Sequence, residues 1–588
     1  MVKPGCLYII VACVVSLHCL AAPLRAEEPI EIAIEGIEGD ALRNVREALT
    51  LPAGMTGEGK VDRLWLEHFK QQSTEKVRSA LEPFGYYSAR IGATIEDLGP
   101  DRYRLRVMVT TGEPVRVKTV EISLHGPGAE EESLKALVST FPLHRGDLLL
   151  QKKYEDAKGR LLSQAQALGY ADATFDLHEI LIAPTKTDAR IRLLLETGER
   201  YRFGEVKIEG TPGYPESFLR RYLAFKPGEI FSPAKLAETQ LNLTNSDRFK
   251  EVIVTPEKEK NQQSLMAVLV RLKPNPPKTL HPGIGYGTDT GARVSLRYRD
   301  LNMLRLGHEL NANLLIAQNI QGLATVYTIP SPRDIRSFTG IQLNLQRQDV
   351  VTYVSRLISL EVDRNRGFGP GRVGTAFVRL QQEDFTVGAQ NSGARLVLPG
   401  LRFNENHYDN QIRPTQGYHY GIELHGVHQA LGSDVDLLQL ITDGSVLIPL
   451  PWRLSLHTRA KSATTLLSDS LVDLPVSLRF FAGGDQSVRG YSFQSLGPRD
   501  SSGKVAGGKH LLVGSAELER ALFDKWGISL FYDAGNAFNS FDNIRLFQGA
   551  GAGVHYYSPI GALNLYLARQ IGVDSPAWHI HFTVGFEL

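Results

Sequence analysis

Residues 480–491 of this 588-residue chain read FFAGGDQSVRGY. This loop motif comprises Gly483, Gly484, Val488, Arg489, Gly490 and Tyr491. A strand-like run precedes the motif, and runs that alternate between apolar and polar residues surround it on both sides. An arginine in such a loop can fold back into a barrel and meet a buried carboxylate, so the flanking sequence must show whether a barrel is present.

Short alternating runs separated by turn residues fill the chain from Leu280 to Leu588, without a convincing amphipathic helix. The last run places Trp578, Ile580, Phe582, Val584, Phe586 and Leu588 on one face. We count eleven strands before the Arg489 loop and five after it, which makes sixteen. With its connection, each strand takes roughly 19 residues, and one membrane crossing takes about 9–11.

An even number of antiparallel strands is typical of bacterial outer-membrane barrels. No segment after the N-terminus is apolar over the ~18 residues of a membrane helix, so a membrane-spanning chain must close into a barrel. A soluble all-β domain is the alternative, because alternation alone fits both. The formal net charge of +1 and the 22% of charged residues indicate no nucleic-acid partner.

The N-terminus is predicted to be a secretory signal peptide at 1–26. Lys3 precedes a largely apolar stretch from Cys6 to Ala22, and cleavage is expected after Ala26 or after Ala22. An uncleaved anchor is the alternative. All three cysteines lie in this segment (Cys6, Cys13 and Cys19), so the mature chain has no thiol. This suits a protein exported through an oxidising compartment.

The first half of the chain is a tandem repeat. Phe84-Gly85-Tyr86 recurs as Leu168-Gly169-Tyr170, and Thr111-Gly112-Glu113 recurs as Thr197-Gly198-Glu199. The periodicity of each unit predicts strand–helix–helix–strand–strand. We place the units at 27–112, 113–198 and 199–275, with the barrel at 276–588. The proline-rich stretch Lys273–Pro277 is expected to be a stiff linker.

The loop motif closely resembles the V-R-G-[FY] element of the BamA/TamA superfamily of outer-membrane assembly and secretion proteins. Three further stretches resemble elements of this superfamily in the same order: RPTQGY at 413–418, FYDAGN at 531–536 and GAGVHYYSPIG at 551–561. The repeated units resemble POTRA domains, and their number favours the TamA family, the translocation and assembly module outer-membrane subunit. The resemblance implies three tandem α+β POTRA domains in the periplasm and a 16-stranded antiparallel transmembrane β-barrel in the outer membrane of a Gram-negative cell.

The resemblance also implies that Arg489 pairs with Asp533 and holds the long loop inside the pore. Alternation over Trp526–Asp533 puts Asp533 on the face opposite the presumed lipid face, with Phe531 as an apolar irregularity beside it. A carboxylate there can receive the guanidinium in a bidentate pair. A solvated Arg489 unrelated to Asp533 is the alternative.

The seam between the first and last strands is the second candidate site. The first strand has Gly283, Gly285 and Gly287 at alternate positions, and the last strand carries Phe582, Gly585 and Phe586. Glycine weakens a strand, so this seam could part and receive a substrate strand by β-augmentation. Alternatively, the glycines only fit a tight curve or bulge.

No catalytic residue, cofactor or metal site is predicted, and the protein is not expected to be an enzyme. His579 and His581 share a strand face, but no third ligand is evident, so we interpret them as polar filler of the lumen. The resemblance implies a factor that inserts or translocates β-barrel proteins and autotransporters. Its expected partners are a TamB-like inner-membrane-anchored protein, unfolded outer-membrane protein substrates and outer-membrane lipid. The alternatives are a two-partner-secretion-type exporter pore, a BamA-like main assembly subunit and a lipase-type barrel enzyme.

Overall fold

The structure is a computed structural model. It describes residues 29–51, 56–57, 60–99, 102–183, 185, 187–211, 213–258, 264–388, 390–410, 414–468, 470–501, 503–542, 544–558 and 561–584. The predicted signal peptide with both cleavage positions, and the predicted seam residues Gly585 and Phe586, lie outside these residues. The chain divides into two compact parts, which differ from the three repeat units described below. They are Met1–Glu205 with Pro227–Ala234 and Lys258–Ala267, and Val206–Lys226 with Lys235–Glu257 and Val268–Leu588.

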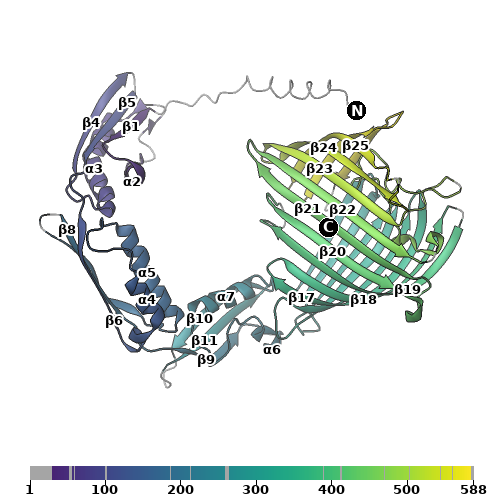
Figure 1. The fold of residues 1–588 in the computed structure, drawn as a ribbon, viewed down its shortest axis with the longest axis horizontal. Coiled ribbons are helices and arrows are strands. Elements are labelled where there is room, and N and C mark those ends of the chain that lie inside the picture. Colours follow the sequence, from purple (N-terminus) through teal and green to yellow (C-terminus); the bar gives the residue numbers. More distant parts are fainter. Residues whose placement is uncertain are drawn as a thin grey trace. The chain divides into compact units, whose positions relative to one another are not determined.

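The first repeat unit is a three-stranded sheet with two helices (Figure 1). Its main elements are β1 (Ile30–Glu35), α2 (Gly39–Ala48), α3 (Arg63–Leu81), β4 (Arg90–Gly99) and β5 (Arg102–Thr110), with a short hairpin of β2 (Thr56–Gly57) and β3 (Lys60–Val61). The strand order is β1-β5-β4, and β1 runs parallel to β5. The apolar side chains that the sequence spaces along α3, among them Leu66 and Val77, are buried against Leu105 of the sheet.

The second and third units repeat this plan. The second has β6 (Arg116–His125), α4 (Glu132–Ser139), α5 (Gln151–Ala167), β7 (Thr174–Ile182) and β8 (Asp188–Glu196). The third has β9 (Arg202–Glu209), α6 (Glu216–Arg220), α7 (Pro233–Thr244), β10 (Phe249–Lys258) and β11 (Leu265–Pro274). Their sheets are ordered β6-β8-β7 and β10-β11-β9. The predicted series of three α+β units is therefore confirmed.

The repeated glycines mark the joints between successive units. The backbone N–H of Val115, where the second unit begins, donates to the carbonyl of Gly85 at 2.8 Å. The N–H of Tyr201 donates to the carbonyl of Gly169 at the same distance. Both glycines have positive φ, 87° and 98°, and a Cβ at Gly169 would lie 2.7 Å from the side chain of Ile230. Only glycine adopts a positive φ and leaves this space free without strain.

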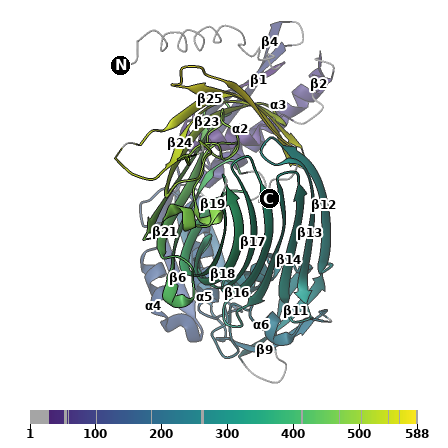
Figure 2. The ribbon, with the colours of Figure 1, turned by 90° about the vertical axis from the view of Figure 1, so that its right-hand side faces the viewer.

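The C-terminal part is a closed barrel of sixteen strands in sequence order, as predicted (Figures 1 and 2). The strands are β12 (Lys278–Gly287), β13 (Gly291–Met303), β14 (His308–Ala317), β15 (Ile320–Pro330), β16 (Phe338–Asp349), β17 (Tyr353–Gly369), β18 (Arg372–Val387), β19 (Gln390–Tyr408), β20 (Gly417–Val427), β21 (Leu437–Leu450), β22 (Leu454–Leu467), β23 (His510–Phe523), β24 (Trp526–Phe538), β25 (Phe547–Ser558), β26 (Gly561–Ile571) and β27 (Trp578–Val584). The first and last strands pair antiparallel and close the ring.

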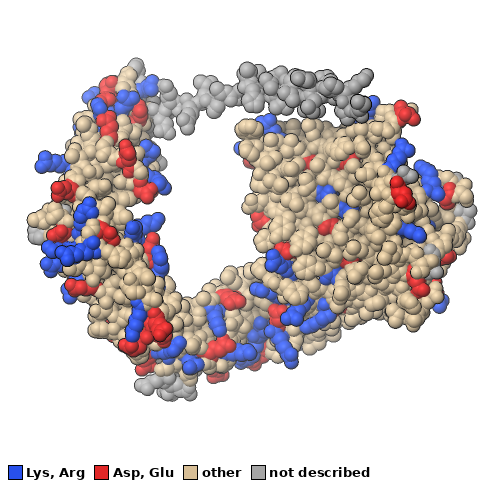
Figure 3. Space-filling model, in the orientation of Figure 1, with Lys and Arg blue, Asp and Glu red and all other residues tan. Residues whose placement is uncertain are grey.

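The barrel is apolar outside and polar inside. Large apolar side chains such as Ile284, Leu530 and Ile580 are exposed, whereas acidic residues such as Glu383 and Asp533 are buried. Figure 3 shows few charged side chains on the visible barrel wall. This inversion is the pattern of a barrel whose outer face meets lipid, and it excludes a water-soluble sandwich. Separately, no helix among the described residues is long and apolar enough to cross a membrane.

The connection into the barrel is shorter than predicted. Strand β11 continues through Lys273 and Pro274, so the linker prediction is wrong for those two residues, and only 275–277 separate β11 from β12. Proline has no backbone N–H to donate to a neighbouring strand, and Pro274 is the last residue of β11. The N–H of Asn275 donates to the carbonyl of Arg248 at 2.8 Å. The connection is therefore tied back to the third unit by its first residue.

Candidate functional site

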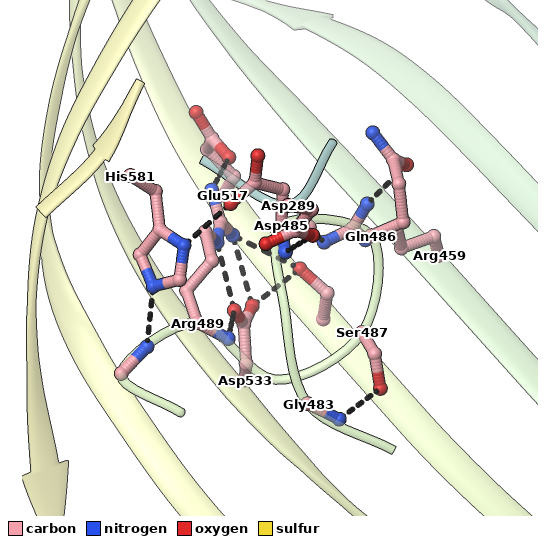
Figure 4. A network of polar contacts seen from close by, with 12 residues as sticks. Asp289, Arg459, Gly483, Asp485, Gln486, Ser487, Arg489, Glu517, Asp533 and His581 are labelled. Atoms are coloured by element: carbon pink, nitrogen blue, oxygen red, sulfur yellow. Dashed lines mark hydrogen bonds and ion pairs between the residues drawn. The ribbon is translucent and has the colours of Figure 1, made fainter. Parts of the chain in front are cut away.

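The long loop between β22 and β23, at 468–509, turns back on itself at the predicted motif (Figure 4). The N–H of Gly484 donates to the carbonyl of Tyr491 at 3.1 Å, and the N–H of Gly483 donates to Ser487 Oγ at 3.1 Å. Gly483, Gly484 and Gly490 all have positive φ, near 100°. A Cβ at Gly483 would lie 2.5 Å from the Ser492 carbonyl oxygen. The glycines therefore allow a compact turn that presents Arg489 from its tip.

The structure brings Arg489 and Asp533 together. Arg489 Nε donates to Asp533 Oδ2 at 2.7 Å and Nη2 donates to Oδ1 at 2.8 Å, so the pair is bidentate. The backbone N–H of Arg489 adds a third bond to Oδ2 at 3.0 Å. Arg489 is 2% exposed and Asp533 is 0% exposed. Charge-assisted bonds in such a dry setting are strong and hold one geometry.

Further groups complete the arginine site. Arg489 Nη1 forms an ion pair with Glu517 of β23 at 2.6 Å, and Nη2 donates to Ser515 Oγ at 3.2 Å. The guanidinium carbon lies 3.6 Å from the centre of the Phe531 ring and 4.6 Å from that of Tyr566, within cation–π range. Burial alone would lower the pKa of Arg489, but the hydrogen bonds and charges of Asp533 and Glu517 outweigh it and raise the pKa. The loop cation therefore stays charged.

The seam joins β12 to the described part of β27, which ends at Val584. Two register pairs join these strands among the described residues, Tyr286 with Val584 and Gly287 with Thr583. β12 pairs with β13 over the whole of its own length, from Lys278 to Gly287. A Cβ at Gly285 would lie 2.6 Å from the Val584 carbonyl oxygen, so that glycine permits close approach of the two strands.

Two of the other predicted seam residues, Gly283 and Phe582, are among the described residues. Gly283 faces Ser295 of β13, where a Cβ would lie 2.6 Å from the serine Oγ. Phe582 on β27 accepts a bond from the N–H of Thr288 at 3.1 Å, and its N–H donates to Thr288 Oγ1 at 3.1 Å. Its ring centre lies 6.3 Å from that of Tyr286. These contacts lie at the end of β12 that leads into the turn at 288–290.

Comparison with known proteins identifies the family. Residues 302–587 match the Omp85 superfamily domain. This chain belongs to the Omp85 superfamily. Residues 31–111 of this Omp85 protein match the POTRA domain TamA domain 1, and residues 201–274 match a POTRA repeat described as a surface antigen variable number repeat. The chain is thus an outer-membrane β-barrel protein with N-terminal periplasmic POTRA domains, and it falls among the outer-membrane assembly and translocation factors.

Several relatives are named outer membrane protein assembly factor BamA. The one from Nitratidesulfovibrio vulgaris (strain Hildenborough) is 22% identical over 572 residues, which are 91% of this chain and 69% of that protein. The one from Neorickettsia risticii (strain Illinois) is 21% identical over 401 residues, 63% of this chain and 53% of that protein. The crystal structure of BamA from Haemophilus ducreyi lacking POTRA domains 1–3 has a TM-score of 0.68 at 18% identity. It covers 80% of this chain and 99% of that chain, which shows a shared fold.

The loop of this Omp85 barrel has another anchor, on β17 and β18. Glu383 of β18 is fully buried and accepts bonds from Ser355 Oγ at 2.7 Å, from the N–H of Ser477 at 3.3 Å and from the hydroxyl of Ser477. Arg479 donates to three backbone carbonyls of the same loop, those of Val472, Leu474 and Ala506. The loop is therefore held on β17 and β18 as well as at the arginine site.

Sequence reasoning missed several residues of the site: Asp289, Asp485, Ser515, Glu517, Tyr566 and His581. Ser515 and Glu517 share one face of β23, and Ser515 lies opposite Asp533 in the register, so parity could have found them. The interpretation of His581 as polar filler is wrong, because its ring donates to Asp485 and accepts from the N–H of Gly490. Membership of the Omp85 superfamily agrees with the prediction that the protein is not an enzyme.

Proposed function

We propose that this Omp85 protein inserts or translocates outer-membrane β-barrel proteins and that the seam between β12 and β27 receives the incoming strand. The observation that carries the proposal is the seam itself, where β12 has glycine at 283, 285 and 287, and Gly285 and Gly287 lie against Val584 and Thr583 of β27. Glycine weakens a strand, so the seam is the junction at which we expect the barrel to part.

A strand edge exposed by parting offers unpaired N–H and C=O groups to a substrate strand. Addition of that strand by backbone hydrogen bonds is β-augmentation, which needs no particular side-chain sequence. A factor working this way can therefore accept many unfolded barrels. The names of the relatives, which are outer membrane protein assembly factors, support this function.

The finer proposal is a TamA-type role. In it the POTRA domains bind a TamB-like inner-membrane-anchored partner, and autotransporters are among the substrates. The match of residues 31–111 to a first POTRA domain of TamA type supports it. Depletion of this protein followed by an inventory of outer-membrane proteins distinguishes the two roles. Loss restricted to autotransporters and a few barrels fits the TamA-type role. Loss of most barrels fits a BamA-like main assembly subunit.

A disulfide across the seam tests the lateral route. Gly287→Cys with Thr583→Cys joins a register pair, and a Cβ at 287 would lie 3.7 Å from Thr583 Cγ2. The native cysteines at 6, 13 and 19 all lie in the predicted signal peptide, so the engineered thiols have no competitors in the mature chain. The control is Leu567→Cys with Ile580→Cys, a register pair of β26 and β27 that does not cross the seam.

We expect the oxidised seam variant to stop inserting a β-barrel substrate into vesicles, and a reductant to restore insertion. The control disulfide should leave insertion unchanged. Insertion at the parent rate through the oxidised seam would eliminate the lateral route.

A further inference from the structure

The turn that presents Arg489 also carries Asp485, which points toward the seam rather than toward Asp533 (Figure 4). Its backbone N–H donates to Oδ2 of Asp289 at 2.9 Å, and its carboxylate accepts from Thr288 Oγ1 at 3.4 Å. Both partners lie in the turn directly after the first strand, β12. The same carboxylate accepts from Nδ1 of His581, on the last strand, β27. One loop residue therefore contacts both sides of the seam.

We infer that Asp485 and His581, with Asp289, form a latch that holds the first and last strands together through the loop. The inference rests on the proposed role of the seam and names the residues that control its opening. Withdrawal of the loop removes the contacts of Asp485 to both strands at once. The backbone pairing between β12 and β27 and the bonds between Thr288 and Phe582 remain.

The hydrogen bonds fix the protonation of the histidine. The N–H of Gly490 donates to His581 Nε2 at 2.9 Å, so Nε2 is an acceptor and Nδ1 carries the proton that it gives to Asp485. Gln570 of β26 donates to the Gly490 carbonyl at 2.9 Å. The loop thus contacts β26 and β27 through Asp485, which precedes Arg489, and through Gly490, which follows it.

The latch and the arginine site are parts of one rigid turn. Asp485 and Arg489 are four residues apart in a turn closed by its own hydrogen bonds, and Arg459 of β22 donates to the Asp485 carbonyl at 2.9 Å. A movement of the loop therefore breaks the bonds at Asp533 and at His581 together. Burial and the charge of Asp485 raise the pKa of Asp289 to about 6, so near neutral pH the two carboxylates oppose each other. That opposition makes the latch easier to release than a salt bridge.

A metal ion is the competing explanation of the cluster. Carboxylate oxygens of Asp289 and Asp485 and a ring nitrogen of His581 lie within 4.8 Å of one another. However, a metal bound at Nδ1 would require the proton on Nε2, which faces the N–H of Gly490. The hydrogen-bond pattern therefore favours a latch without metal, and the test includes a chelator.

The test measures the seam directly and needs no substrate. Spin labels at Ile284→Cys and Ile580→Cys sit on lipid-facing positions of β12 and β27, which are 82% and 63% exposed and outside the latch. The full-length protein is placed in vesicles of phosphatidylethanolamine and phosphatidylglycerol. Pulsed electron spin resonance then gives the distribution of distances across the seam for the parent, D485A, H581A and the matched control H579A.

We expect D485A and H581A each to raise the long-distance population about five- to tenfold, the scale of one lost hydrogen bond. H579A should match the parent, because the neighbouring histidine lies outside the latch. Heat-modifiable mobility in gels checks that each barrel is folded, and D485N, which keeps an acceptor for Nδ1–H, should recover most of the closed population.

A D485A distribution identical to that of the parent would overturn the latch. So would a parent seam that widens in EDTA and closes again with Zn²⁺, because a metal would then hold the cluster. Neither outcome bears on the disulfide experiment, so the latch can fail while the proposed assembly function stands.

Discussion

Removal of the Arg489 side chain is the most informative single perturbation of this barrel. In Arg489→Ala, Asp533 and Glu517 lose their shared cation while both stay inside the protein. Breaking a buried ion pair from one side costs about 3–5 kcal/mol, because a buried charge is left uncompensated. The lower value for exposed pairs, about 0–1 kcal/mol, does not apply where both partners are at most 2% exposed.

The reciprocal variant should cost less, which makes the prediction specific. In Asp533→Ala, Arg489 keeps Glu517 at 2.6 Å and both aromatic rings, so its charge is still balanced. In Arg489→Ala, the hydrogen-bond donors that Asp533 keeps among the described residues are neutral: Ser515 Oγ at 2.6 Å and the backbone N–H of residue 489. Arg489→Lys should fall between the parent and Arg489→Ala, since an ammonium restores a positive charge but cannot form the bidentate pair.

Urea titration of the folded barrel in lipid vesicles gives the free energy of unfolding for each variant. We expect Arg489→Ala to lose about 3–5 kcal/mol and Asp533→Ala roughly half as much, and the double variant to lose less than the two losses combined. The reasoning is refuted if Arg489→Ala unfolds within about 0.5 kcal/mol of the parent, or if Asp533→Ala is the more damaged of the two.

Three further outcomes follow from contacts outside that pair. Gly169→Val, at a POTRA joint with positive φ, should destabilise its joint by about 1–3 kcal/mol in hydrogen exchange of the full chain, whereas Gly159→Ala on the open face of α5 should not. Glu383→Ala should release the loop around Ser477 and speed proteolytic cleavage there several-fold while Arg489 stays paired; unchanged cleavage would show that this anchor is dispensable. Phe531→Leu should cost about 0.5–2 kcal/mol in urea titration by removing the cation–π contact.

The strands, and the face of each strand on which a residue lies, could be predicted from the sequence. Alternation along 526–533 is enough to place Asp533 inward, because a strand has a period of two and the lipid face must be apolar. The same rule left Phe531 as an irregularity. The structure supplies its reason: the ring is an inward platform for a cation, and only the partner explains an apolar residue on a polar face.

The latch was out of reach, because its parts meet only after the barrel closes. Asp485 lies 196 residues from Asp289 and 96 from His581 along the chain, and no periodicity relates a loop position to a strand end. The inward face of His581 follows from parity, but its partner depends on the path of the loop through the lumen. The pairing of β12 with β27 likewise depends on register, which glycines at alternate positions do not fix.

The joints between the repeated units have a consequence for how such proteins change in length. The glycine carbonyl of one unit receives the first N–H of the next in the same way at both junctions, at Gly85 and at Gly169. A duplicated unit would therefore bring its own connector and fit between existing neighbours without redesign of either. Deletion of one unit would rejoin the same carbonyl to an equivalent amide. The series of repeat units can therefore gain or lose whole units over evolutionary time while the barrel stays as it is.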